Sequence, residues 1–240
     1  MSGVLFNGFP AEGLQFLKRL KRNNTREWFN DNKAVYEESV RKPLQHLVEV
    51  LAVEFAEFAP EILASPKASL YRIHRDTRFS KDKSPYKTHV AAVFPVRALG
   101  KHEGAGFYFH ISPQEVLVGG GLYMPSSEDL QAVRKALASD HRRLTRILEG
   151  KAFHRMFGEM TGERLSRVPR GFAATHPAAD YLRFKQFLAA RQFPAEFATS
   201  PKFAATLVET FRTLHPLVQF LNEPILASRR SRERQDSLLA

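Results

Sequence analysis

The residues best suited to chemistry in this sequence lie between Tyr71 and Lys87, in the stretch YRIHRDTRFSKDKSPYK. Six basic side chains and two acids give this stretch a net charge of +4. The guanidinium group of arginine stays charged and offers a planar fork that matches the oxygens of a carboxylate or a phosphate. The stretch therefore predicts an oxyanion site in which three arginines, spaced by three residues, clamp the ligand: Arg72, Arg75 and Arg78.

Other side chains of the stretch complete this predicted site. Lys83 adds a further cation, and the hydroxyl group of Tyr86 can donate a hydrogen bond to the same ligand. Asp76 either orients the arginines or acts as a base, so Asp76 and Tyr86 are the catalytic candidates. The alternative is structural: Asp76 and Asp82 pair with neighbouring basic residues and hold a long surface loop in shape.

Histidine is the other residue type that can move protons here. The nine histidines form no His-x-x-x-His or His-Glu-x-x-His pair, so we expect no metal site. His74, His89 and His110 all fall on expected strands and can converge. Because the pKa of histidine lies near 6.5, His89 or His110 beside the arginines would suit ligand binding or acid–base work. The alternative for each is an ordinary hydrogen-bonded histidine.

The stretch from Arg72 to Tyr86 resembles the signature of a family of bacterial and fungal proteins of about this length, domain of unknown function 2461. The resemblance rests on the pattern R-x-x-R-D-x-R-F-x-x-x-K-x-P-Y. Further stretches between roughly residues 6 and 222 are similar to the same family, namely NTREWF, GGGLYMP, PRGF, and His176-Pro177 with Lys185. The resemblance implies an α+β fold and a shared site that includes Lys185 as a ligand-binding residue. It brings no reaction and no cofactor.

The elements that must position these residues follow from hydrophobic periodicity. Apolar residues at helical spacing predict helices over the first quarter, with Asn24 as the N-cap of a short helix. Alternating and β-branched residues predict four strands, over 70–74, 89–96, 107–111 and 115–123. The last half returns to helix, including one that starts at Pro177 and runs through Leu188. We expect one α+β domain over residues 1–227, with a mainly antiparallel sheet at about 68–124 packed by helices, and a disordered basic tail over 228–240.

Three glycines, Gly119 to Gly121, stand at the end of an expected strand and before a helix. They lack the Gly-Lys-Ser/Thr ending of a phosphate-binding loop and the spacing of a dinucleotide fingerprint. Acids at 128 and 129 would repel an anion from the following helix N-terminus. The glycines therefore indicate a bulge or a close approach of another backbone.

Composition limits the classes of function. The 240 residues include no cysteine, which excludes thiol catalysis and a disulfide framework, and the longest apolar run is far too short to span a membrane. We expect a cytoplasmic protein that does not bind a membrane. The net charge of +11 favours anionic partners, with a phosphorylated or carboxylate small molecule ahead of nucleic acid. Three hypotheses stay open: an anion-binding domain with or without hydrolytic activity, a nucleic-acid-binding protein or nuclease, and a non-enzymatic interaction module. The sequence identifies no cofactor.

Overall fold

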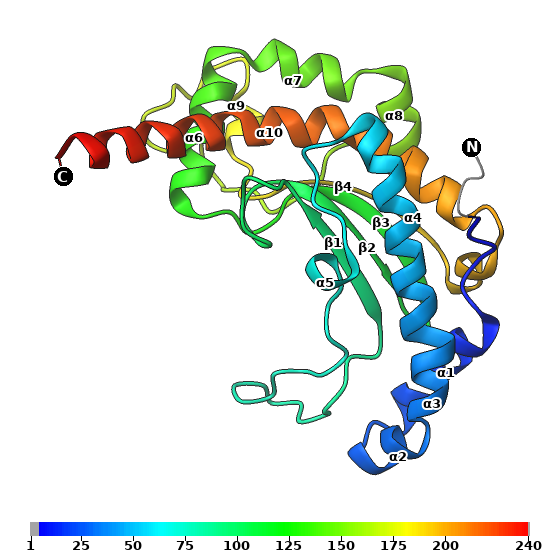
Figure 1. The fold of residues 1–240 in the computed structure, drawn as a ribbon. Helices are drawn as coiled ribbons and strands as arrows, with labels where there is room; N and C mark the ends of the chain where they lie inside the picture. Colours follow the sequence, from blue (N-terminus) through cyan, green and yellow to red (C-terminus); the bar gives the residue numbers. More distant parts are fainter. Residues whose placement is uncertain (1–4, 240) are drawn as a thin grey trace. The chain divides into compact units, whose positions relative to one another are not determined.

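The computed structural model describes residues 5–239 and has the α+β architecture that the sequence predicts (Figure 1). Helices precede and follow the strands along the chain, and one strand lies between the later helices. The elements up to the end of the second strand are α1 (Ala11–Arg22), α2 (Arg26–Asp31), α3 (Lys33–Tyr36), the π-helical η1 (Glu37–Arg41), α4 (Lys42–Phe58), α5 (Pro66–Ser69), β1 (Val90–Pro95) and β2 (Gly106–Ile111). The later elements are β3 (Glu115–Leu122), α6 (Ser127–Ser139), α7 (His141–Leu148), α8 (Lys151–Phe157), α9 (Ala179–Leu182), β4 (Phe187–Pro194), the 3₁₀-helical η2 (Ala195–Thr199) and α10 (Phe203–Leu239).

The four strands form one antiparallel sheet in the order β1-β2-β3-β4. In β2, Phe107, Phe109 and Ile111 are fully buried while Tyr108 and His110 are half-buried, as the alternation predicts. The fourth strand differs from the prediction. Residues 70–74 join β1 through an isolated bridge between Leu70 and Ala92 rather than as a strand, and the sheet is completed by β4.

The prediction of a helix through Leu188 was wrong beyond Leu182. Only Ala179–Leu182 is helical, and Phe187 begins β4. Phe187 and Ala189 are buried, while the residue after each is more exposed, which is the two-residue period of a strand with one core face. Burial of this face against the rest of the structure outweighs the local helix signal given by Pro177.

The chain divides into two compact units. The first holds the described residues up to 94, together with 108–118 and 192–209. The second holds 95–107, 119–191 and 210–239. Each of the four strands contributes residues to both units. A single domain over residues 1–227 stays a prediction.

Aromatic side chains fill the core of the first unit. The Phe55 and Phe94 rings meet edge-on with centroids 5.1 Å apart, and Phe94 lies 6.1 Å from Phe109. Phe109 in turn contacts Phe203 at the start of α10, at 6.4 Å. This core fixes β1, the strand that follows the arginine-rich stretch.

In the second unit a buried arginine joins α6 to the end of α9 and to the chain that follows it. Arg134 is only 8% exposed, and it donates from Nε to the carbonyl of Leu182 (2.9 Å) and from Nη2 to that of Phe184 (3.0 Å). Helix α10 continues to Leu239, so residues 228–239 of the predicted disordered tail are helical, and residue 240 lies outside the described residues. No helix among the described residues is both long enough and apolar enough to cross a membrane.

Candidate functional site

The arginine-rich stretch forms a two-limbed ribbon that leads into β1 (Figure 1). We call residues 70–75 and 85–89 the ribbon, and residues 76–84 the tip loop. The amide of Arg75 donates to the carbonyl of Pro85 (2.9 Å), and the amide of Lys87 donates to that of Ile73 (2.8 Å). These hydrogen bonds pair the limbs in antiparallel fashion, so the tip loop is held at both ends.

Tyr86 anchors the ribbon to the helices of the first unit. Its ring is 4% exposed and stacks on Phe29 of α2, with centroids 4.1 Å apart and planes at 15°. His74, opposite Tyr86 on the other limb, lies 5.2 Å from the same ring. The structure therefore places Tyr86, a predicted ligand contact, in the core.

Asn24 clamps the backbone of Tyr86 from the chain before α2. Its Nδ2 donates to the Tyr86 carbonyl (2.9 Å), and its Oδ1 accepts from the Tyr86 amide (3.1 Å). The predicted role of Asn24 as an N-cap was wrong, because Thr25 caps α2 by accepting from the amide of Trp28. The carboxamide of Asn24 can pair with both backbone groups of an extended residue, and this long-range contact takes precedence over the local cap.

Replacing Asn24 by alanine is expected to lower the free energy of unfolding by about 1 to 3 kcal/mol, because two backbone groups of a buried residue lose their partners. Hydrogen exchange of the Tyr86 amide should accelerate with it. The matched control is Asn30→Ala, which changes an exposed asparagine of α2. Equal effects of the two substitutions in chemical denaturation would contradict the clamp.

The tip loop is braced by ion pairs that its acids form with Arg78 and with Arg75 of the ribbon. Arg75 pairs with Asp82 and donates to Ser80 Oγ (3.2 Å). Arg78 holds Asp76 by two hydrogen bonds, Nη2 to Oδ2 at 2.8 Å and Nε to Oδ1 at 3.1 Å. These contacts match the structural alternative that the sequence offers for the two acids.

Hydrogen bonds from Arg78 lower the pKa of the exposed Asp76 carboxyl. The pKa of Asp82 is also lowered, mainly by hydrogen bonds from Ser84 and then by one from Arg75. The Lys83 side chain also bonds within the loop, where its Nζ donates to the carbonyl of Thr77 (3.0 Å). A carboxylate with a lowered pKa is a weak base, so the geometry favours a structural role for Asp76.

A second group of basic side chains lies at the base of the ribbon, where it joins the sheet. We call this group the cationic row: Arg72, Lys87, His89 and His110. The His89 and His110 rings lie 5.6 Å apart, and Lys87 Nζ stands 4.9 Å from the centroid of the Tyr71 ring. The antiparallel pairing of β1 with β2 brings the two histidines together.

The members of the cationic row act on one another electrostatically. Burial and then the charge of Arg72 lower the pKa of Lys87. The pKa of His89 is lowered by burial first, and then by His110 and Lys87. Burial also lowers the pKa of His110, against the opposite effect of Glu115. Burial therefore favours the neutral form of both imidazole rings.

His110 is held through both ring nitrogens. Nε2 lies 3.4 Å from Glu115 Oε1, and Nδ1 lies 3.2 Å from the Tyr108 hydroxyl. The sequence did not single out Tyr108, Glu115 or Lys87 as site residues. The available signal was the polar face of β2, where Tyr108 and His110 alternate with buried phenylalanines.

Lys185 lies in the second unit, where Nζ pairs with Glu163 Oε2 at 3.2 Å. His176 accepts from the amide of Ala178 at Nδ1 (3.0 Å), and its Nε2 lies 3.1 Å from the carbonyl of Ala138. The described residues bring no three histidine, aspartate or glutamate side chains together as a metal cluster.

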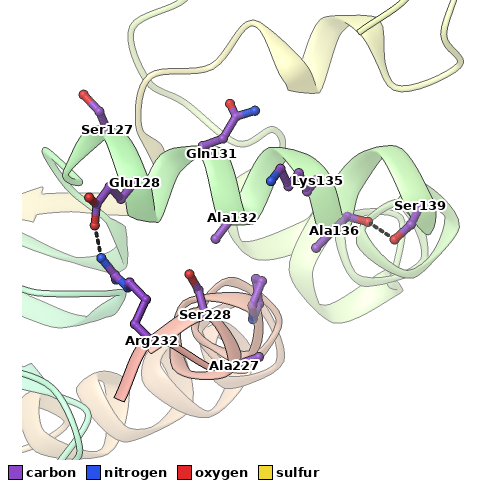
Figure 2. A pocket seen from close by; sticks show the side chains of 11 residues that line it. Ser127, Glu128, Gln131, Ala132, Lys135, Ala136, Ser139, Ala227, Ser228 and Arg232 are labelled. Carbon is purple, nitrogen blue, oxygen red and sulfur yellow. Dashed lines mark hydrogen bonds and ion pairs between the residues drawn. The ribbon is translucent and has the colours of Figure 1, made fainter. Parts of the chain in front are cut away.

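A hollow of about 690 Å³ lies in the second unit between α6 and α10 (Figure 2). Small and polar side chains line it, and the ion pair between Arg232 and Glu128 stands at its edge. None of its lining residues belongs to the predicted site.

Fold and ribbon together define an α+β protein with a braced, arginine-rich hairpin. The model of the conserved hypothetical protein family DUF2461 matches residues 12–220, and the chain belongs to this family. The resemblance noted in the sequence is thereby confirmed. Neither the curated proteins nor the solved structures provide a match.

Proposed function

We propose that this chain binds an oxyanion, a phosphorylated or carboxylate-bearing small molecule, at the cationic row. The observation that carries the proposal is that Arg72 and Lys87 form no ion pair with an acid among the described residues, although Arg72 acts electrostatically on the Asp76 carboxylate. Among the described residues, Glu115 is the one acid within ion-pair distance of the row, with its Oε1 3.4 Å from Nε2 of His110. Lys87 and both histidines are half-buried. A cation that is partly desolvated and has no acid as ion-pair partner among the described residues, as Lys87 is, favours a ligand that supplies negative charge.

The tip loop can contribute to anion binding only by giving up contacts that it makes within itself. Arg75, Arg78 and Lys83 already have acceptors within the loop, so a ligand must replace Asp76, Asp82 or the Thr77 carbonyl to reach them. A doubly charged anion can make this exchange, because it offers more acceptor atoms than one carboxylate. Lys185 and the catalytic roles of Asp76 and Tyr86 stay predictions.

The affinity for the anion should rise as the pH falls. Burial lowers the pKa of His89 and of His110, and a nearby bound anion acts in the opposite direction, so that binding takes up protons. We expect affinity to increase by up to about tenfold per pH unit below pH 6.5 for each proton taken up. Calorimetric titration with sulfate measures this directly, because the charge of sulfate is constant in that range.

The same lowered pKa values give folding stability the opposite pH dependence. The unfolded chain takes up these protons first, so stability falls as the pH drops below about 6.5, and titrations must stay within the folded range. His89→Gln and His110→Gln should flatten the dependence of affinity on pH, whereas the exposed His154→Gln should preserve it. A sulfate affinity that does not change with pH in the unaltered protein would contradict the proposed involvement of the histidines.

A further inference from the structure

The tip loop exposes an aromatic ring beside several cations. Phe79 is 95% exposed, the highest value among the exposed large hydrophobic side chains of the described chain. The guanidinium carbon of Arg78 lies 5.8 Å from the centroid of this ring, within the range of a cation–π contact. Exposure of a whole phenyl ring to water is unfavourable, which suggests that the exposed ring has a function.

The braces of the loop hold Phe79 in the exposed position. The Arg78–Asp76 pair precedes the ring, and the Arg75–Asp82 pair closes the loop around it. Lys83 ties the far side back to the Thr77 carbonyl. The ring is therefore offered on an ordered support, which reduces the entropy lost when a partner binds.

The surroundings of Phe79 indicate the chemistry of its partner. Between 76 and 84 it is the one large apolar residue, and the exposed Lys81 lies two residues beyond it. One phenyl ring gives too little apolar area to hold a membrane or a hydrophobic protein face. Proteins bind unpaired nucleobases by stacking them on exposed aromatic rings next to cations, and this contact tolerates different base sequences.

We infer that Phe79 is a stacking platform for a nucleobase, and that the ligand of the cationic row is single-stranded nucleic acid. This inference rests on the oxyanion site of the proposed function and puts a polynucleotide in place of the small-molecule ligand. A polynucleotide carries both a row of phosphates and unstacked bases, so one strand can contact Arg72 and Lys87 at the ribbon base and place a base on Phe79. Salt should weaken such binding, because cations of the protein replace counterions of the strand.

Fluorescence anisotropy with a labelled single strand of about 12 nucleotides, and with an abasic strand of equal length, tests the inference. Phe79→Ala should weaken binding of the normal strand by about 5- to 150-fold, and should leave the abasic strand unchanged. Phe79→Trp should retain or strengthen binding. The matched control is Tyr123→Ala, which removes an aromatic ring that is 62% exposed elsewhere in the chain.

The inference would be overturned if Phe79→Ala bound the normal strand as tightly as the unaltered protein does. It would also be overturned if the substitution weakened binding of the normal and the abasic strand equally. A third contradicting outcome is that the protein binds phosphatidylserine vesicles through Phe79 but does not bind the strand. Titration with pyrophosphate distinguishes a failure of the nucleic-acid inference from a failure of the proposed oxyanion site. Binding of pyrophosphate that depends on Arg72 would preserve the oxyanion site even if the strand does not bind.

Discussion

Replacing Arg72 by glutamine is expected to reduce the affinity for pyrophosphate by about 10- to 100-fold, since a charge-assisted hydrogen bond contributes roughly 1.5 to 3 kcal/mol. Arg72 is exposed and forms no ion pair with any residue that the structure describes, so its positive charge is available to a ligand. The substitution removes the guanidinium group and keeps a polar side chain. It should therefore leave the free energy of unfolding nearly unchanged.

Lys87→Gln should produce a loss of similar size, because Lys87 is the other cation of the row without a carboxylate partner among the described residues. Lys67→Gln, an exposed lysine of α5, controls for the general loss of positive charge. Calorimetry at fixed, low salt separates the local effect from screening. The assignment fails if Lys67→Gln costs as much affinity as Arg72→Gln.

Replacing Gly121 by alanine is expected to lower the free energy of unfolding by about 3 kcal/mol or more, through strain and overpacking together. Gly121 has a φ of +122°, a backbone conformation that side chains with a Cβ atom rarely adopt. An added Cβ would also lie 2.0 Å from the carbonyl oxygen of Phe187 in β4, so the strand would have to move.

Gly158→Ala is the matched control for this substitution. Gly158 also has a positive φ, +68°, but nothing lies within 4 Å of the Cβ that alanine would add. It should cost less than Gly121→Ala, because it adds backbone strain without overlap with a neighbouring strand. Comparable midpoints for the two variants in guanidinium denaturation would contradict a steric role for Gly121.

The glycines show where sequence reasoning succeeds. Without a phosphate-loop ending, the three consecutive glycines predicted close approach of another backbone, and Gly119 and Gly121 both lie against carbonyls of β4. The strand that approaches them was missed. Its apolar residues follow a helix-starting proline, and a short segment of this kind fits helical and extended spacing almost equally well.

At the candidate site, too, some contacts could be predicted from the sequence and others could not. The local pairs Arg78–Asp76 and Arg75–Asp82 join residues close in sequence, and the sequence offered them as its structural alternative. The cationic row depends on the register of β1 against β2, which brings His89 to His110. Register follows from the packing of whole strands, so spacing along the chain does not reveal it. Asn24 is a similar case, because its partner Tyr86 lies 62 residues away.

Nuclear magnetic resonance of the arginine, lysine and histidine side chains during titration with pyrophosphate tests the oxyanion site most directly. We expect saturable shifts at Arg72, Lys87, His89 and His110 with one common dissociation constant, and none at Lys67 or Lys185. Saturable shifts that leave the cationic row unmoved, or no saturable shift at all, would contradict the proposal that this row is the anion-binding site.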